Sequence, residues 1–418
     1  MLVALVLVVV VALAWFLWPR PEPDYPLRQE VFVQPLDHGR PEGPTFEQFV
    51  DILEPVGAGP DAPVFFVLGG EANATRARLV RIYEAYGAPK DVIFVQAEHR
   101  GYGESLSAGD QTVPVYVTVD QALADFHAVV QALKARYPGP WAAGGYSYSG
   151  GLVIDFAARY PDDVDAILSS SGVVDWPFTM DAYDAKVRLV FGPETYERVT
   201  GHIENLQPAE LFDENWLERE FLIAFVHGIS QYKEYRPYLP FFKAATRLST
   251  PNLLKALHWL DDTIADQAAW NYAVSNGKLT LSHEEALTFD YTWRTWRYQQ
   301  CDEVGIFEIS QVPGGIFNRG HDDFVAECRA LFGPEQPRSA DGPAWSPRAA
   351  LDSLAVPLVY VAGEVDPWEG LGIERDYPLG EGEYFFVPDG RHCPDSRNPE
   401  LGVEVFATLI DYARGGQP

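Results

Sequence analysis

A chain of 418 residues that is 47% hydrophobic and 13% aromatic can bury one large core or two smaller ones, which excludes a disordered protein. Its formal net charge of −29 is spread along the chain and repels phosphate backbones and anionic lipid surfaces, so we expect no nucleic-acid partner. Three cysteines are too few for a disulfide scaffold, but they allow one pair and one free thiol.

Residues 1–18 form an unbroken apolar run, and residues 19–30 form a Pro-rich, charged linker. Roughly 20 apolar residues cross a bilayer, so the run is short but sufficient, and Trp15 and Trp18 suit the membrane interface. We interpret the run as an uncleaved anchor; a cleaved signal peptide, with its site at the Ala-Leu-Ala of residues 12–14, is the alternative. Both interpretations predict an exported protein, secreted or held at the cell surface, that contacts the membrane only through this segment.

Short apolar runs that end in glycine or charged residues indicate buried parallel strands. They lie at residues 62–70, 91–103, 140–147, 164–172, 356–366 and 383–392. Between the early runs, residues 117–137 carry apolar side chains at helical spacing, and Asp120 is the expected N-cap of that helix. Strands that alternate with helices predict an α/β fold with a mostly parallel sheet covered on both faces.

Residues 175–347 carry a different pattern of long, aromatic, helical stretches without strand signals. We interpret them as a helical cap inserted between two strands of a core formed by residues 31–174 and 348–418. The alternative is an independent helical domain unrelated to the site. The cap is favoured because binding pockets are common at such junctions.

The stretch GGYSYSGGL, residues 144–152, contains two serines that fit a nucleophile elbow, the Gly-x-Ser-x-Gly turn between a strand and a helix. With either serine at its centre, the stretch departs from the pattern at one small position, so the local sequence does not decide. The preceding strand ends before Tyr146, which places Ser147 at the turn and Ser149 inside the helix. This argument favours Ser147 and an α/β-hydrolase fold.

An elbow serine needs a histidine base and a carboxylate that orients it, which follow in the chain order Ser, Asp or Glu, His. Asp366 and His392 each follow a predicted strand in that order, at the sheet edge where α/β proteins gather their sites. Asp175, Glu364 and Asp395 are rival carboxylates, but none combines a strand-end position with the required order as well.

The oxyanion hole of this geometry uses two backbone N–H groups. One belongs to the residue after the nucleophile, here Tyr148, and the other to a loop after an earlier strand. The loop at residues 69–73 is glycine-rich, and we expect the second N–H from Gly70; a plain tight turn explains the same residues.

Several stretches resemble the serine peptidase family of lysosomal Pro-Xaa carboxypeptidase and dipeptidyl-peptidase II. They are GGEAN (69–73), EHRGYGES (98–105), GGYSYSGGL (144–152), WRYQQCDEVG (296–305), GEVDPWEGLGI (363–373) and GRHCPDSRNPE (390–400). Residues 33–50 and 124–141 are more similar to the related secreted bacterial tripeptidyl aminopeptidases. Ser149 and Cys393 depart from the family pattern, which has glycine and, in the dipeptidyl type, a second histidine there.

The resemblance implies Ser147 as nucleophile, Asp366 as orienter and His392 as base, with no metal or organic cofactor. It also implies a disulfide between Cys301 and Cys328, which leaves Cys393 free.

The activity that the resemblance implies is cleavage of peptides near a chain end after proline. Glu71 is a candidate for pairing with a substrate's α-amino group, which predicts an aminopeptidase that releases di- or tripeptides; the alternative is that Glu71 only braces its loop. Trp368 and Tyr148 are candidates for lining a proline pocket. A Pro-Xaa carboxypeptidase, a carboxylester hydrolase and an inactive hydrolase fold that binds a partner are the other hypotheses, because triad geometry alone does not select the substrate.

Overall fold

The computed structural model describes most of the chain after the apolar run. The described residues are 26–106, 115–176, 179–209, 213–264, 292–305, 314–317, 319–339 and 343–416. The predicted anchor at residues 1–18 and most of the predicted linker lie outside these ranges. Within them, no helix has both the length and the apolar character needed to cross a membrane.

A single sheet of eight strands in the order β1-β2-β4-β3-β5-β6-β7-β8 forms the core. Pairing is antiparallel from β1 to β2 and from β2 to β4, and parallel between all other neighbours. The strands are β1 (Leu27–Pro35), β2 (Thr45–Leu53), β3 (Val64–Leu68), β4 (Ile93–Ala97), β5 (Trp141–Tyr146), β6 (Ala166–Ser170), β7 (Leu358–Gly363) and β8 (Glu383–Val387). Each of the six predicted apolar runs contains one of β3 to β8, and the α/β-hydrolase fold class is confirmed.

The register aligns the carboxyl ends of four neighbouring strands. Tyr146 at the end of β5 pairs with Ser170 at the end of β6, and Gly363 at the end of β7 pairs with Val387 at the end of β8. Because these strands are parallel, the segments that follow β5, β7 and β8 emerge at one edge of the sheet.

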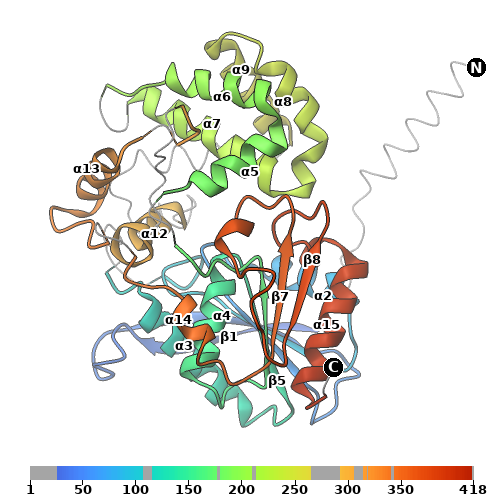
Figure 1. Cartoon of the computed structure of the whole chain (residues 1–418). Coiled ribbons are helices and arrows are strands. Elements are labelled where there is room, and N and C mark those ends of the chain that lie inside the picture. Colours follow the sequence, from blue (N-terminus) through green and yellow to red (C-terminus); the bar gives the residue numbers. More distant parts are fainter. Residues whose placement is uncertain are drawn as a thin grey trace, which may run out of the picture.

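Helices cover both faces of this sheet (Figure 1). One face packs against α3 (Val119–Lys134) and α4 (Tyr148–Arg159), and the other against α2 (Arg76–Ala85) and α15 (Pro399–Ala413). The N-cap of α3 is Thr118, whose hydroxyl accepts a hydrogen bond from the N–H of Gln121 at 3.4 Å. Asp120 lies in the first turn, so the expectation that it caps the helix is wrong; the N-cap lies two residues earlier, at Thr118, and the helix begins at Val119.

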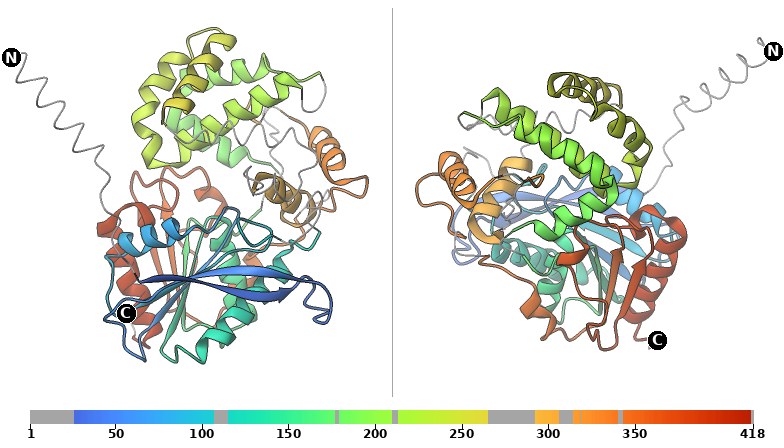
Figure 2. Two further views of the ribbon diagram at one scale, coloured as in Figure 1. Left: turned by 180° about the vertical axis from the view of Figure 1, so that it is seen from behind. Right: turned by 45° about the horizontal axis from the view of Figure 1, so that its top comes forward.

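Between β6 and β7 the described residues form helices and no strand, and these helices lie above the sheet (Figure 2). They are α5 (Asp181–Phe191), α6 (Pro193–Glu204), α7 (Glu214–Gln231), η1 (Lys233–Tyr238), α8 (Leu239–Ala245), α9 (Thr250–Ile264), α12 (Thr292–Gln299), η2 (Gln300–Val304) and α13 (His321–Phe332). Short helices α14 (Arg348–Leu351), η3 (Glu369–Leu371) and η4 (Asp395–Arg397) belong to the returning chain. We call residues 175–347 the cap.

A disulfide joins Cys301 in η2 to Cys328 in α13, with the two Cα atoms 5.8 Å apart, while Cys393 is buried and free. Trp216 at the start of α7 packs in the same apolar cluster as both disulfide cysteines. Beside this cluster lies a buried charge network of residues from α7, α12, α13 and the segment directly before α13, formed by Arg219, Glu220, Arg297, Arg319 and Glu327. This network joins the start of α7 to α12 and α13, and the disulfide joins η2 to α13.

Candidate active site

Ser147 occupies the sharp turn between β5 and α4. Its backbone has φ 58° and ψ −124°, a conformation that non-glycine residues adopt only under strain. The turn is tight enough that a Cβ on Gly145 would lie 1.9 Å from the carbonyl oxygen of Ser149, and one on Gly150 would lie 2.6 Å from Cα of Gly172. Glycines on both sides therefore permit the close approach of strand, turn and helix that a nucleophile elbow requires.

Ser149 lies inside α4 and is fully buried. Its hydroxyl accepts a hydrogen bond from the backbone N–H of Tyr146 at 2.9 Å and donates one to the carbonyl oxygen of Tyr146 at 3.0 Å. This hydroxyl is therefore committed to closing the turn. Ser147, which is half-buried, is the serine whose position suits attack on a substrate.

His392 and Asp366 lie together beyond the ends of β8 and β7. Nδ1 of His392 is 2.9 Å and 3.1 Å from the two carboxylate oxygens of Asp366, and both side chains are almost fully buried. The backbone N–H of Trp368 donates to Asp366 at 3.0 Å and fixes the carboxylate. Burial favours neutral imidazole, but the Asp366 charge outweighs it and raises the pKa of His392 well above its ordinary value.

Two of the rival carboxylates have other partners. Asp175 forms an ion pair with Arg348, in which Nε of the arginine is 3.1 Å from the carboxylate. Glu364 is exposed and accepts a hydrogen bond from the N–H of Asp389 at 3.1 Å. The carboxylate that hydrogen-bonds Nδ1 of His392 is that of Asp366.

Asp395, the third rival, is fully buried below the His392 loop. It accepts hydrogen bonds from the hydroxyl of Tyr86 at 2.6 Å and from the hydroxyl of Ser170. Desolvation in this environment raises the pKa of Asp395. Its contacts link the loop to α2 and to the end of β6, which is a structural role.

Glu71 lies close to both the elbow and the base. The Ser147 side chain and the charge of His392 both act to lower the pKa of its carboxylate. Burial raises the pKa of Glu71 in spite of these partners. Ser147, Glu71 and His392 therefore converge on one site, although they come from three distant stretches of the chain.

Gly70, in the same loop as Glu71, faces the start of α4, and a Cβ there would lie 3.2 Å from Cβ of Ser149. This close approach supports the predicted oxyanion loop. Tyr148 follows the nucleophile, but its ring is only 1% exposed and packs against Trp296 and Trp345. The backbone N–H of Tyr148 stays the predicted oxyanion donor. The burial of the ring argues against the prediction that it lines a substrate pocket.

Trp368 is half-buried and follows Asp366 by two residues. Its ring lies 4.9 Å from Tyr183, which in turn contacts Phe317 and His227 at 5.8 Å and 5.1 Å between ring centroids. These cap residues, which the sequence did not single out, include Tyr183 and Phe317, which are themselves almost fully buried. The contact therefore packs Trp368 against the cap, and a substrate pocket lined by Trp368 stays a prediction.

Glu98, which the sequence reasoning assigned no role, braces the oxyanion loop from behind. Its carboxylate accepts hydrogen bonds from the N–H of Ala74 at 3.0 Å and from the N–H groups of Glu104 and Ser105, both at 2.9 Å. Burial raises the pKa of Glu98 to about 7. The sequence signal that could have identified Glu98 is its position in EHRGYGES, directly after β4.

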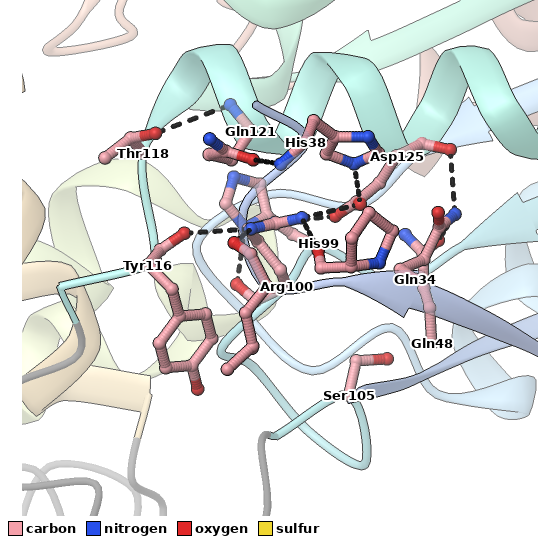
Figure 3. Close-up of polar contacts among 12 residues, drawn as sticks. Gln34, His38, Gln48, His99, Arg100, Ser105, Tyr116, Thr118, Gln121 and Asp125 are labelled. Atoms are coloured by element: carbon pink, nitrogen blue, oxygen red, sulfur yellow. Dashed lines mark hydrogen bonds and ion pairs between the residues drawn. The ribbon is translucent and has the colours of Figure 1, made fainter. Parts of the chain in front are cut away.

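Arg100 of the same motif is a second structural anchor (Figure 3). Its guanidinium forms two hydrogen bonds with the buried Asp125 of α3, at 2.6 Å and 2.7 Å, and donates to the carbonyl oxygens of Leu36 and Tyr116. His38 also contacts Asp125, at 2.7 Å. Arg100 thus joins α3 to the segments beside the motif, which is a structural role.

Comparison of the sequence with known proteins identifies its family. The profile described as "Serine carboxypeptidase S28" matches residues 56–205 and 254–401. The chain belongs to this S28 family of serine peptidases. It is therefore a hydrolase that acts on peptides.

Curated relatives agree with the S28 assignment. The thymus-specific serine protease of Mus musculus is 25% identical over 87% of this chain and 81% of its own. The lysosomal Pro-X carboxypeptidase of Bos taurus is 31% identical over 73% of this chain and 69% of its own. The human lysosomal Pro-X carboxypeptidase is 27% identical over 68% and 66% of the two chains.

Among solved structures, the proline iminopeptidase of Mycobacterium smegmatis aligns with 92% of this chain and 99% of its own, at 16% identity and a TM-score of 0.40.

Proposed function

We propose that this S28 peptidase is an exopeptidase that cleaves after proline near the N-terminus of peptides and releases di- or tripeptides. The observation that carries the proposal is that Glu71 lies close to both Ser147, in its strained turn, and His392. Nδ1 of His392 is in turn hydrogen-bonded to Asp366. This arrangement unites a nucleophile, a base and its orienting carboxylate with a further carboxylate at the same site.

In the proposed reaction, Oγ of Ser147 attacks the scissile carbonyl carbon while Nε2 of His392 accepts the serine proton. Nδ1 faces Asp366, which fixes the required tautomer and stabilises the imidazolium. The N–H groups of Tyr148 and Gly70 stabilise the oxyanion. His392 then protonates the leaving amine, and water hydrolyses the acyl-enzyme by the same path in reverse.

The choice of terminus rests on Glu71. A carboxylate beside the nucleophile pairs with a substrate's α-ammonium group and repels a C-terminal carboxylate. The second candidate is a Pro-Xaa carboxypeptidase, which the names of the bovine and human relatives favour. Export through the N-terminal segment belongs to the proposal as well.

Mass spectrometry of a mixed peptide pool, digested by the purified protein, tests the reaction, with Ser147→Ala and Ser149→Ala as matched variants. We expect N-terminal di- or tripeptides ending in proline, an activity loss on the order of 10⁶-fold for Ser147→Ala, and retained turnover for Ser149→Ala. Loss of single C-terminal residues after proline would reverse the terminus.

Two other outcomes lead to the remaining hypotheses. Strong turnover of simple esters without peptide cleavage would indicate a carboxylester hydrolase. Absence of turnover on both substrate classes would indicate an inactive hydrolase fold that binds a partner.

A further inference from the structure

The C-terminal end of cap helix α7 meets the loop that carries His392. Arg391 donates hydrogen bonds from its guanidinium to the carbonyl oxygens of Ile229 and, at 2.8 Å, of Ser230. The backbone N–H of His392 donates to the carbonyl oxygen of Gln231 at 3.1 Å. The last carbonyl groups of a helix have no partner within it, and here two consecutive residues of the His392 loop satisfy three of them.

The charge of Arg391 suits this position. The C-terminal end of a helix carries partial negative charge, which a cation stabilises. Both hydrogen bonds come from Nη1, so one nitrogen of the planar guanidinium bonds two neighbouring carbonyl groups. Because Arg391 directly precedes His392, this geometry also fixes the backbone from which the imidazole projects.

The Asp366 loop is attached to the cap in a similar way through α5. Nζ of Lys186 donates to the carbonyl oxygen of Glu364 at 2.8 Å and pairs with Glu369 at 2.9 Å. Within the cap, the side chain of Gln231 donates to the hydroxyl of Tyr183 at 2.8 Å, which joins α7 to α5. The loops of both the base and its carboxylate therefore contact one pair of connected helices.

We propose that Arg391 is a positioning residue that uses the end of α7 as a fixed support for His392. The inference rests on the proposed role of His392 as the base for Ser147. The S28 profile matches residues up to 205 and again from 254, so α7 lies between its two matched stretches.

Reaction of Ser147 with a fluorophosphonate tests the inference, because this probe requires an activated serine but no peptide specificity. Labelling rates, kcat and KM are compared among wild type, Arg391→Ala, Arg391→Lys and the control Arg414→Ala, which removes an exposed ion pair with Asp91. We expect Arg391→Ala to lower the labelling rate and kcat at least about tenfold, since sub-ångström to 1 Å misplacement of a catalytic group has effects up to 10²-fold.

KM of Arg391→Ala should stay within about twofold of the wild-type value. Arg391 positions the base, so its loss weakens interactions made in the transition state and leaves substrate binding unchanged. Arg391→Lys should recover part of the rate, since an ammonium keeps the charge and donors for these carbonyl groups but lacks the rigid, planar geometry of the guanidinium. Arg414→Ala should match wild type. If Arg391→Ala does not fold, the Arg391→Lys rate decides by itself.

Folded Arg391 variants that label and turn over as fast as wild type, with only a lower melting temperature, would overturn the inference and leave the proposed function intact. Failure of the wild type to react with the probe would instead overturn the proposed role of Ser147 and His392. Reaction with the probe but no cleavage of prolyl peptides would reject only the substrate class, and the labelling rates would still decide the role of Arg391.

Discussion

The two ends of helix α7 have different neighbours. Its N-terminal end, with Trp216, packs against the Cys301–Cys328 disulfide, and the next turns contribute Arg219 and Glu220 to the buried charge network with α12 and α13. Its C-terminal end contacts the His392 loop through backbone carbonyl groups.

The difference separates two tasks of one helix. The N-terminal end packs in the apolar cluster that contains the disulfide and forms ion pairs with other cap residues, so changes there should act on stability. The C-terminal end accepts hydrogen bonds from the His392 loop, so changes there should act on rate. Variants at or near each end of α7 test this separation of stability from rate.

The largest effect is expected for Asp366→Asn, on the catalytic side. Loss of the carboxylate removes the tautomer control of His392, and kcat should fall on the order of 10⁴-fold. Because the Asp366 charge raises the pKa of His392, the acid limb of the kcat/KM profile should move to lower pH. A pH–rate series of the variant measures both. An unmoved acid limb would mean that another group controls the base.

An intermediate effect is expected for the paired variant Cys301→Ser with Cys328→Ser, on the stability side. The disulfide closes a loop with a sequence separation of 27 residues. Its removal should lower the free energy of unfolding by about 3–4 kcal/mol. Urea denaturation measures the loss, and kcat per folded molecule should stay at the wild-type value. A fall in kcat as large as that of Arg391→Ala would remove the division between the two ends of α7.

The smallest effect concerns pH and Glu303 in η2. Its carboxylate accepts a hydrogen bond from the N–H of Val119 at 2.8 Å and joins this part of the cap to α3. Burial raises the pKa of Glu303 to about 7, so its stabilising contribution is complete below the unfolded pKa near 4.5 and is lost as pH rises through 7.

Glu303→Gln should therefore flatten the decline of stability between pH 5 and 8 by about 2–3 kcal/mol. Melting temperatures across that range measure the slope. Part of the decline should remain in the variant, because the pKa of Glu98 is also raised to about 7. A slope equal to that of wild type would show that Glu303 titrates at its ordinary value.

Sequence patterns predicted the parts of the fold that depend on continuous apolar runs, which are strands β3 to β8. They missed β1 and β2 because these strands pair antiparallel and their polar and apolar residues alternate. β1 is the edge strand and is mostly half-exposed, so length and turn signals alone did not separate it from the linker.

At the site, the end of the predicted strand placed Ser147 correctly at the turn. The sequence could not show that the Ser149 hydroxyl is hydrogen-bonded to the backbone of Tyr146. No local sequence pattern could predict the role of Arg391, because its hydrogen-bond partner Ile229 lies 162 residues earlier in the chain. The Tyr148 ring was expected in a pocket and lies in the core, since aromatic side chains near an elbow serve packing as readily as binding. Contacts of this range require the fold itself.

The order of the strands also bears on how the protein is made. Strands β6 and β7 are neighbours in the sheet, yet the whole cap separates them in the chain. Strands β1 to β6 leave the ribosome first and can pair early, whereas pairing across so long an insertion is late. Asp366 and His392 follow β7 and β8, so a growing chain carries Ser147 long before it acquires the other two residues. The proposed triad therefore implies that the nascent peptidase stays inactive until synthesis of its carboxyl-terminal strands is complete.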